Sequence, residues 1–185
     1  MNGLTELGHV AGLRITAKPS AFITSIVMWV LLVAVAVGVF KLSFGEAIIG
    51  ALVATLLHCL SELAHQLGHS IAARQTGYPM IGICYWGPLA ASIYPKDEPP
   101  LPGRLHIKRA LGGPIMSGLV TLVAGLLYLF VTGTFTLGQN EPHLPLDIVL
   151  VSRFFFLENL LVFTLGAFLP LGFTDGSTIL QWWGK

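Results

Sequence analysis

The chain has 185 residues, of which 54% are hydrophobic and only 10% are charged. A soluble domain usually carries about 25% charged residues, so the composition excludes an ordinary water-soluble globular protein and favours one embedded in lipid. The formal net charge of +1 gives no basis for nucleic-acid binding. We therefore expect an integral membrane protein that is surrounded by the lipid bilayer and has no nucleic-acid partner.

Four apolar segments follow one another along the chain. Residues 21–40 contain no charged side chain and are long enough to cross a bilayer core of about 30 Å. The second segment, 47–73, is polar only in its C-terminal half, and the third and fourth are 110–131 and 148–169. The pattern predicts an all-α polytopic membrane protein with about four transmembrane helices, in which residues 1–185 form a single integral-membrane domain.

A stretch after the second segment has the alternation of a short β-strand. Ile81, Ile83 and Tyr85 occupy every second position, and Pro79 and Gly87–Pro88 bound the stretch. We expect a short β element at the membrane surface. The residues alone favour an ordinary amphipathic loop equally well.

Lys and Arg are distributed unevenly over the connecting loops, which predicts the orientation in the membrane. The loop between the third and fourth segments contains neither, whereas positive residues gather between the second and third segments and in the N-terminal tail. They are Arg74, Lys96, Arg104, Lys108 and Arg109 in the loop, and Arg14 and Lys18 in the tail. We therefore expect a multi-pass protein of the cell's inner or plasma membrane, with both termini in the cytoplasm.

The polar half of the second segment contains "SELAHQLGHSIAAR", in which His65 and His69 are four residues apart. On an α-helix this spacing stacks two imidazoles one turn apart, so both can reach one metal ion. Asp175 follows the fourth segment, on the same predicted side of the membrane. Two histidines, a carboxylate and an open fourth position are the ligand set of a catalytic zinc site. The alternative is a histidine-lined haem or metal-ion membrane protein, although an aspartate fits zinc better than haem.

The motifs, taken in order, resemble those of the site-2 protease family of intramembrane zinc metallopeptidases. "HQLGHSIAARQTGY" is similar to the family's His-Glu-x-Gly-His pattern, "RALGGPIMSG" to the start of its third core helix, and "LPLGFTDGS" to the segment that donates its third ligand. The resemblance implies one Zn²⁺ ion held by His65, His69 and Asp175. It also implies cleavage of transmembrane segments of other membrane proteins, and strands that pair with an unwound substrate, which favours the strand over the loop.

The chain departs from the family pattern at several positions around this site. Gln66 stands where the family has its catalytic glutamate, and Ser117 and Ala167 stand where it has asparagines; Thr174 and Ser177 replace the usual neighbours of the ligating aspartate. A carboxamide orients water but does not accept a proton, and general acid–base catalysis is worth about 10²–10⁴-fold. Proteolytic activity is therefore doubtful. The alternative is an inactive pseudoprotease that binds or regulates membrane proteins.

Glu62 is the candidate for a substitute base. On a helix it lies on the same face as the two histidines, one turn of about 5.4 Å towards the membrane centre. A displaced general base and an additional metal ligand are two possible roles. A partner that orients His65 through its ring N–H, or a paired carboxyl that satisfies the buried face, is the favoured interpretation.

Overall fold

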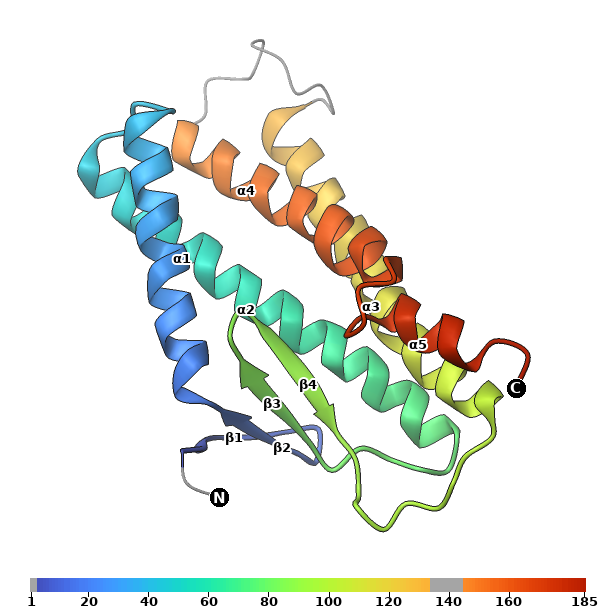
Figure 1. Cartoon of the computed structure of the whole chain (residues 1–185). Coiled ribbons are helices and arrows are strands. Elements are labelled where there is room, and N and C mark those ends of the chain that lie inside the picture. The colour runs from blue at the N-terminus through green and yellow to red at the C-terminus, as the bar shows by residue number, and fades with distance from the viewer. Residues whose placement is uncertain (1–2, 134–144) are drawn as a thin grey trace.

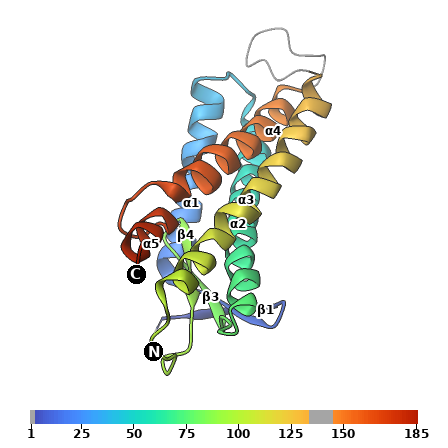
Figure 2. The ribbon, with the colours of Figure 1, turned by 90° about the vertical axis from the view of Figure 1, so that its right-hand side faces the viewer.

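The computed structural model describes residues 3–133 and 145–185. Within them, four helical segments are long and apolar enough to cross a membrane. They are α1 (Pro19–Gly38), α2 (Phe44–Gln75), α3 (Gly103–Thr132) and the segment Leu146–Phe168. A small β-sheet and the short helix α5 (Asp175–Trp182) lie towards one end of the bundle (Figures 1 and 2). The prediction of a polytopic helical membrane protein with a β element after the second helix is confirmed.

The four predicted apolar segments fall on these helices, with different ends. The largest difference is in α3, which begins at Gly103 rather than at residue 110. The prediction missed its first turns because they are rich in basic residues and have no hydropathy signal. The fourth segment is not one regular helix. It consists of α4 (Leu146–Glu158), the π-helix η1 (Asn159–Leu165) and the 3₁₀ turn η2 (Gly166–Phe168).

Helix α2 has a polar buried face and an apolar outer face. Its N-terminus carries a capping box between Ser43 and Glu46, which fixes where the helix begins. Polar side chains at helical spacing are buried along its second half: His58, Ser61, Glu62, His65, Gln66, His69 and Ser70. Leu56 and Leu60 lie on the outer face and are 54% and 59% exposed, so this face suits contact with lipid. Polar groups in a membrane are costly, so this stripe directs α2 towards the bundle interior.

Two glycines bring α2 and α3 into backbone contact. A Cβ on Gly68 would lie under 3.0 Å from the carbonyl oxygen of Gly112, and a Cβ on Gly112 would lie equally close to the carbonyl oxygen of Gly68. Small residues of this kind let membrane helices approach closely. The contact sets the α3 backbone beside the histidines of α2.

The sheet has four strands in the order β1-β2-β3-β4, and β2 pairs with β3 in parallel whereas the other neighbours are antiparallel. The strands are β1 (Thr5–Val10), β2 (Leu13–Ala17), β3 (Gly82–Trp86) and β4 (Leu89–Ile93). The strand predicted around Ile83 is therefore one half of the β3–β4 hairpin.

The β1–β2 hairpin was not expected, because the residues before the first helix were interpreted as a tail. Leu13 and Ile15 of β2 pack with Ala73, Met80 and Ile83 in one buried cluster. The connecting residues 11 and 12 have φ values of 51° and 79°, as a two-residue hairpin turn requires. The burial of β2 against β3 and the end of α2 explains why this short terminal hairpin is ordered.

The orientation in the membrane stays a prediction. The loop between α3 and α4, whose lack of Lys and Arg contributes to that prediction, lies mostly outside the described residues.

Candidate metal centre

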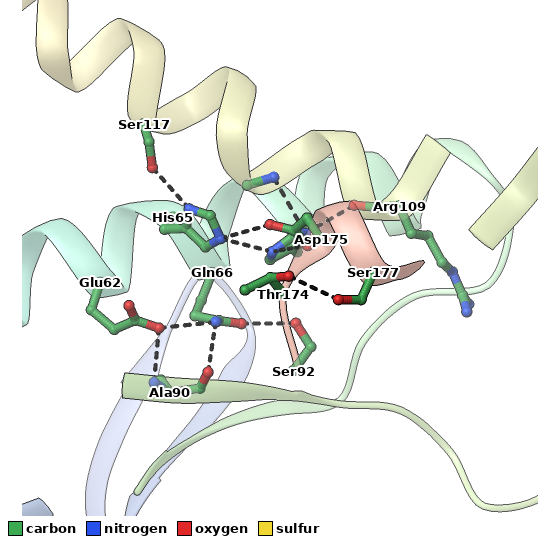
Figure 3. A network of polar contacts seen from close by, with 12 residues as sticks. Glu62, His65, Gln66, Ala90, Ser92, Arg109, Ser117, Thr174, Asp175 and Ser177 are labelled. Atoms are coloured by element: carbon green, nitrogen blue, oxygen red, sulfur yellow. Dashed lines mark hydrogen bonds and ion pairs between the residues drawn. The ribbon is translucent and has the colours of Figure 1, made fainter. Parts of the chain in front are cut away.

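The three predicted metal ligands lie together where α2 meets the first residue of α5 (Figure 3). His65 Nε2 is 3.2 Å from Asp175 Oδ2, His69 Nε2 is 3.3 Å from Asp175 Oδ1, and the two Nε2 atoms are 3.1 Å apart. One ligand atom from each residue lies within 4.8 Å of the others, and both histidines are buried. The structure thus brings together two residues of one helix and one that follows more than a hundred positions later.

One face of α3 orients the two imidazoles. His65 Nδ1 is 2.8 Å from the hydroxyl of Ser117, and His69 Nδ1 is 2.9 Å from the carbonyl oxygen of Arg109. A carbonyl only accepts, so His69 carries its proton on Nδ1 and turns the Nε2 lone pair towards Asp175. The amide of Gly113 approaches the same Nδ1 at 3.3 Å, a longer contact that would need the other tautomer. Metal-ligating histidines are usually held through their second nitrogen in this way.

The space between the imidazoles fits a metal ion. A Cβ on Gly113 would lie under 3.0 Å from Nε2 of both His65 and His69, so the absence of a side chain there keeps that space open. The carboxylate of Asp175 and the two ring nitrogens lie about 3 Å from one another, so a positive charge among them, from a bound metal ion or from a proton on an imidazole, would stabilise the arrangement. Two nitrogens and one carboxylate are a zinc ligand set. These residues therefore fit Zn²⁺.

Two hydroxyl side chains on either side of Asp175 form hydrogen bonds within the turn that precedes α5. The Thr174 hydroxyl donates to the carbonyl of Leu169 and is 3.0 Å from the hydroxyl of Ser177. The Ser177 hydroxyl accepts from the amide of Gly172 at 2.7 Å. These bonds close the turn that leads into α5, whose first residue is Asp175.

Gln66 faces β4, and its carboxamide is bonded at both ends (Figure 3). Its Nε2 donates to the carbonyl oxygen of Ala90 at 2.9 Å and to Glu62 Oε1 at 3.1 Å, and its Oε1 accepts from the Ser92 hydroxyl at 2.8 Å. Glu62 Oε1 also accepts from the amide of Ala90 at 2.8 Å. Among the described residues, the group with ligand atoms in mutual reach consists of His65, His69 and Asp175, without Glu62.

The two positions of the family's asparagines differ in what they contribute. Ser117 is 1% exposed and contacts His65 directly. Ala167 is a buried residue of η2 whose methyl group offers no hydrogen bond. Towards the N-terminus of α2, His58 Nδ1 lies 2.7 Å from Glu158 Oε1, and Asn159 donates to the Ser61 hydroxyl at 2.9 Å. These two contacts join the fourth membrane segment to α2.

Arg109 is a buried residue that sequence analysis counted only as a loop charge. Its guanidinium pairs with both carboxylate oxygens of Glu98, donates to the carbonyl of Tyr78 and lies 4.3 Å from the centre of the Tyr94 ring. These contacts hold the segment between β4 and α3, and the Arg109 carbonyl accepts from His69. The hydrogen bond from Arg109 also lowers the pKa of Glu98 below its ordinary value of 4.5.

A scan against models of known protein families finds no match, and a search of curated protein sequences also finds none. Among solved structures, the chain is similar to the Site-2 Protease from Methanocaldococcus jannaschii, with a TM-score of 0.58 and 20% sequence identity. The similarity covers 96% of this chain and 70% of that one. At this identity the comparison shows the fold alone, which is that of a site-2 protease.

Proposed function

We propose that the protein is a zinc-binding membrane protein with the site-2 protease fold that binds membrane-protein segments without cleaving them efficiently, which makes it a pseudoprotease. The observation that carries the proposal is a contrast between two neighbouring residues of α2. His65 is paired with Asp175 as a metal ligand would be, whereas Gln66 next to it is bonded to β4 and offers no basic group.

Peptide hydrolysis requires more than a metal. Zinc bound by the three ligands would act as a Lewis acid towards a carbonyl oxygen or a water molecule. A side chain must also take up a proton and return it to the leaving amine, a contribution of about 10²–10⁴-fold. The Gln66 carboxamide does not take up that proton, and Glu62 Oε1 is already bonded to Ala90 N–H and to Gln66. The chain's own groups therefore support binding over catalysis.

The resemblance to intramembrane metallopeptidases supplies the proposed clients, which are transmembrane segments of other membrane proteins. A mostly apolar cavity of about 440 Å³ lies between α1, the N-terminal half of α2 and the fourth membrane segment, whereas the metal centre lies on the C-terminal half of α2. Side chains such as Leu32, Ala51 and Phe154 line it, and they suit an apolar client.

The zinc content of detergent-purified protein tests the metal centre. We expect about one zinc per chain in the wild type and almost none in His65→Ala or Asp175→Ala, because each variant removes one of three protein ligands. His9→Ala is the matched control, since His9 lies on β1 with an exposed side chain. Zinc that is retained in both ligand variants would refute the centre, and a strong Soret band in the visible spectrum would indicate haem instead.

A further inference from the structure

The edge strand of the sheet nearest the metal centre is already occupied. β4 pairs with β3 on one side only and is the last strand in the sheet order. On its other side, Glu62 Oε1 accepts from the amide of Ala90 at 2.8 Å and Gln66 Nε2 donates to the carbonyl of the same residue at 2.9 Å. Both backbone groups of Ala90 are therefore bonded to side chains of α2 (Figure 3).

Those two groups are among the ones that a further strand would use, and they lie at the centre of β4. Neighbouring residues of a strand direct their backbone groups to opposite sides, so Ala91, in register with Cys84, faces β3 while Ala90 faces outwards. An added strand would donate one hydrogen bond to the Ala90 carbonyl and accept one from its amide. Glu62 and Gln66, one helical turn apart, present the same acceptor and donor.

We propose that Glu62 and Gln66 form a clamp, here called the β4 clamp, that closes this edge of the sheet to an extended peptide until the clamp is released. The inference rests on the proposed function only for the kind of client, an unwound membrane-protein segment. The clamp itself needs no metal and no catalysis.

The residue types fit this role. A glutamate at position 66 would be unable to donate to the Ala90 carbonyl and would set a second carboxylate beside Glu62. Gln66 provides a donor for the strand and for Glu62 and an acceptor for Ser92 in one side chain. Glu62 is 3% and Gln66 is 5% exposed, so water competes poorly for these bonds.

Hydrogen exchange at the Ala90 amide tests the clamp in the full-length protein in detergent, with selective ¹⁵N-alanine labelling. We expect protection of Ala90 in the wild type and exchange about tenfold faster in Glu62→Met, which removes the acceptor of this amide. In Gln66→Met we expect a smaller acceleration, of about fivefold, because the Ala90 carbonyl and Glu62 lose their donor. Ala91 is the internal control and should exchange at an unchanged rate in both variants, since its backbone groups face β3.

Access to the edge is tested with a fluorescein-labelled synthetic peptide of alternating Val and Thr, an extended segment of defined chemistry. We expect it to bind both variants about tenfold more tightly than the wild type. Equal binding to wild type and variants, or an unprotected Ala90 amide in the wild type, would overturn the clamp. Zinc content, measured on the same samples, reports whether each variant is folded at the metal centre. If Ala90 is unprotected but zinc is bound, the clamp is refuted and the proposed function stands. If Ala90 is protected but no zinc is bound, the proposed function is refuted and the clamp stands.

Discussion

Two polar clusters lie side by side on α2, and they differ in what would satisfy them. In the first, Nε2 of His65, Nε2 of His69 and the carboxylate of Asp175 converge to within 3.3 Å, an arrangement that a bound metal ion or a proton on an imidazole would stabilise. In the second, Gln66 donates to Glu62 and to the Ala90 carbonyl, and Glu62 accepts from the Ala90 amide, so that every contact pairs a donor with an acceptor. The first cluster has the geometry to receive an ion, whereas the second is satisfied by hydrogen bonds within the chain.

The comparison indicates how a chain with this fold can change its chemistry at one position. Gln66 fills its place beside His65, because its carboxamide joins α2 to β4. A substitution at position 66 would therefore change both the acid–base chemistry of the side chain and the hydrogen bonds that join α2 to β4, and experiments must separate the two effects.

The largest effect, on zinc content, is expected from Gly113→Ala, which changes the first cluster but leaves the three proposed ligands in place. The added methyl group would lie under 3.0 Å from both Nε2 atoms and would take the space of the ion, so zinc content should fall from about one per chain to nearly none. Gly118→Ala is the control on the same helix, since its nearest neighbour would be Thr164 Cγ2 at an ordinary 3.9 Å. Metal analysis of both purified variants decides the matter, and full zinc in Gly113→Ala would mean that the ion binds elsewhere.

Gln66→Glu should produce the next largest effect, in the second cluster. If the remaining machinery is intact, a restored base would raise cleavage of a model transmembrane substrate by about 10²–10⁴-fold. Gln66→Met is the matched variant, because it also loses the bonds to Ala90 and Glu62 but supplies no base. Cleavage by Gln66→Glu, with none by Gln66→Met or the wild type, would show that the wild type lacks only a general base at this position. Cleavage by both would point to release of β4, and cleavage by neither would mean that Ser117, Ala167 or the path of the substrate has also changed.

Ser117→Ala tests the support of the first cluster and should have an intermediate effect. Without the hydroxyl, His65 Nδ1 loses its partner at 2.8 Å in a fully buried place. Loss of such a contact to a ligating histidine typically costs about 10–100-fold in metal affinity. Competition with a chelator measures it. Ser152→Ala, a buried serine bonded to a carbonyl of its own helix, should leave zinc affinity unchanged.

The parts of the molecule that were predictable from sequence are those that depend on local periodicity. Long apolar runs predict the membrane helices, and the spacing of His65 and His69 follows from the helical repeat. The alternation in β2 was also present, with Leu13, Ile15 and Ala17 at every second position, but its short length beside a chain terminus made it easy to interpret as a tail.

The contacts of Gln66 were not predictable in the same way. They depend on which residue of β4 lies opposite which turn of α2, and no local pattern encodes that register. Arg109 illustrates the same limit, because a basic residue near a membrane boundary is normally a solvated charge. It is buried here because Glu98 and the Tyr78 carbonyl accept hydrogen bonds from its two terminal nitrogens and Tyr94 covers one face of the guanidinium.

The smallest effect is expected from lowering the pH, at the ion pair between Arg109 and Glu98. The carbonyl of Arg109 accepts from His69, so this pair adjoins the first cluster. Arg109 lowers the pKa of Glu98 in the folded protein, so the pair contributes its full stabilisation of the fold at pH values above the ordinary pKa of 4.5. This stabilisation is lost as the pH falls through the lowered pKa and the carboxylate is protonated. The melting temperature of the wild type should therefore exceed that of Glu98→Gln at pH 6, and the difference should shrink towards pH 3. Asp97→Gln is the control on the neighbouring residue. A difference that stays constant over this range would mean that the Arg109–Glu98 pair does not hold the segment that leads into α3, and that the Arg109 carbonyl is positioned for His69 by the helix alone.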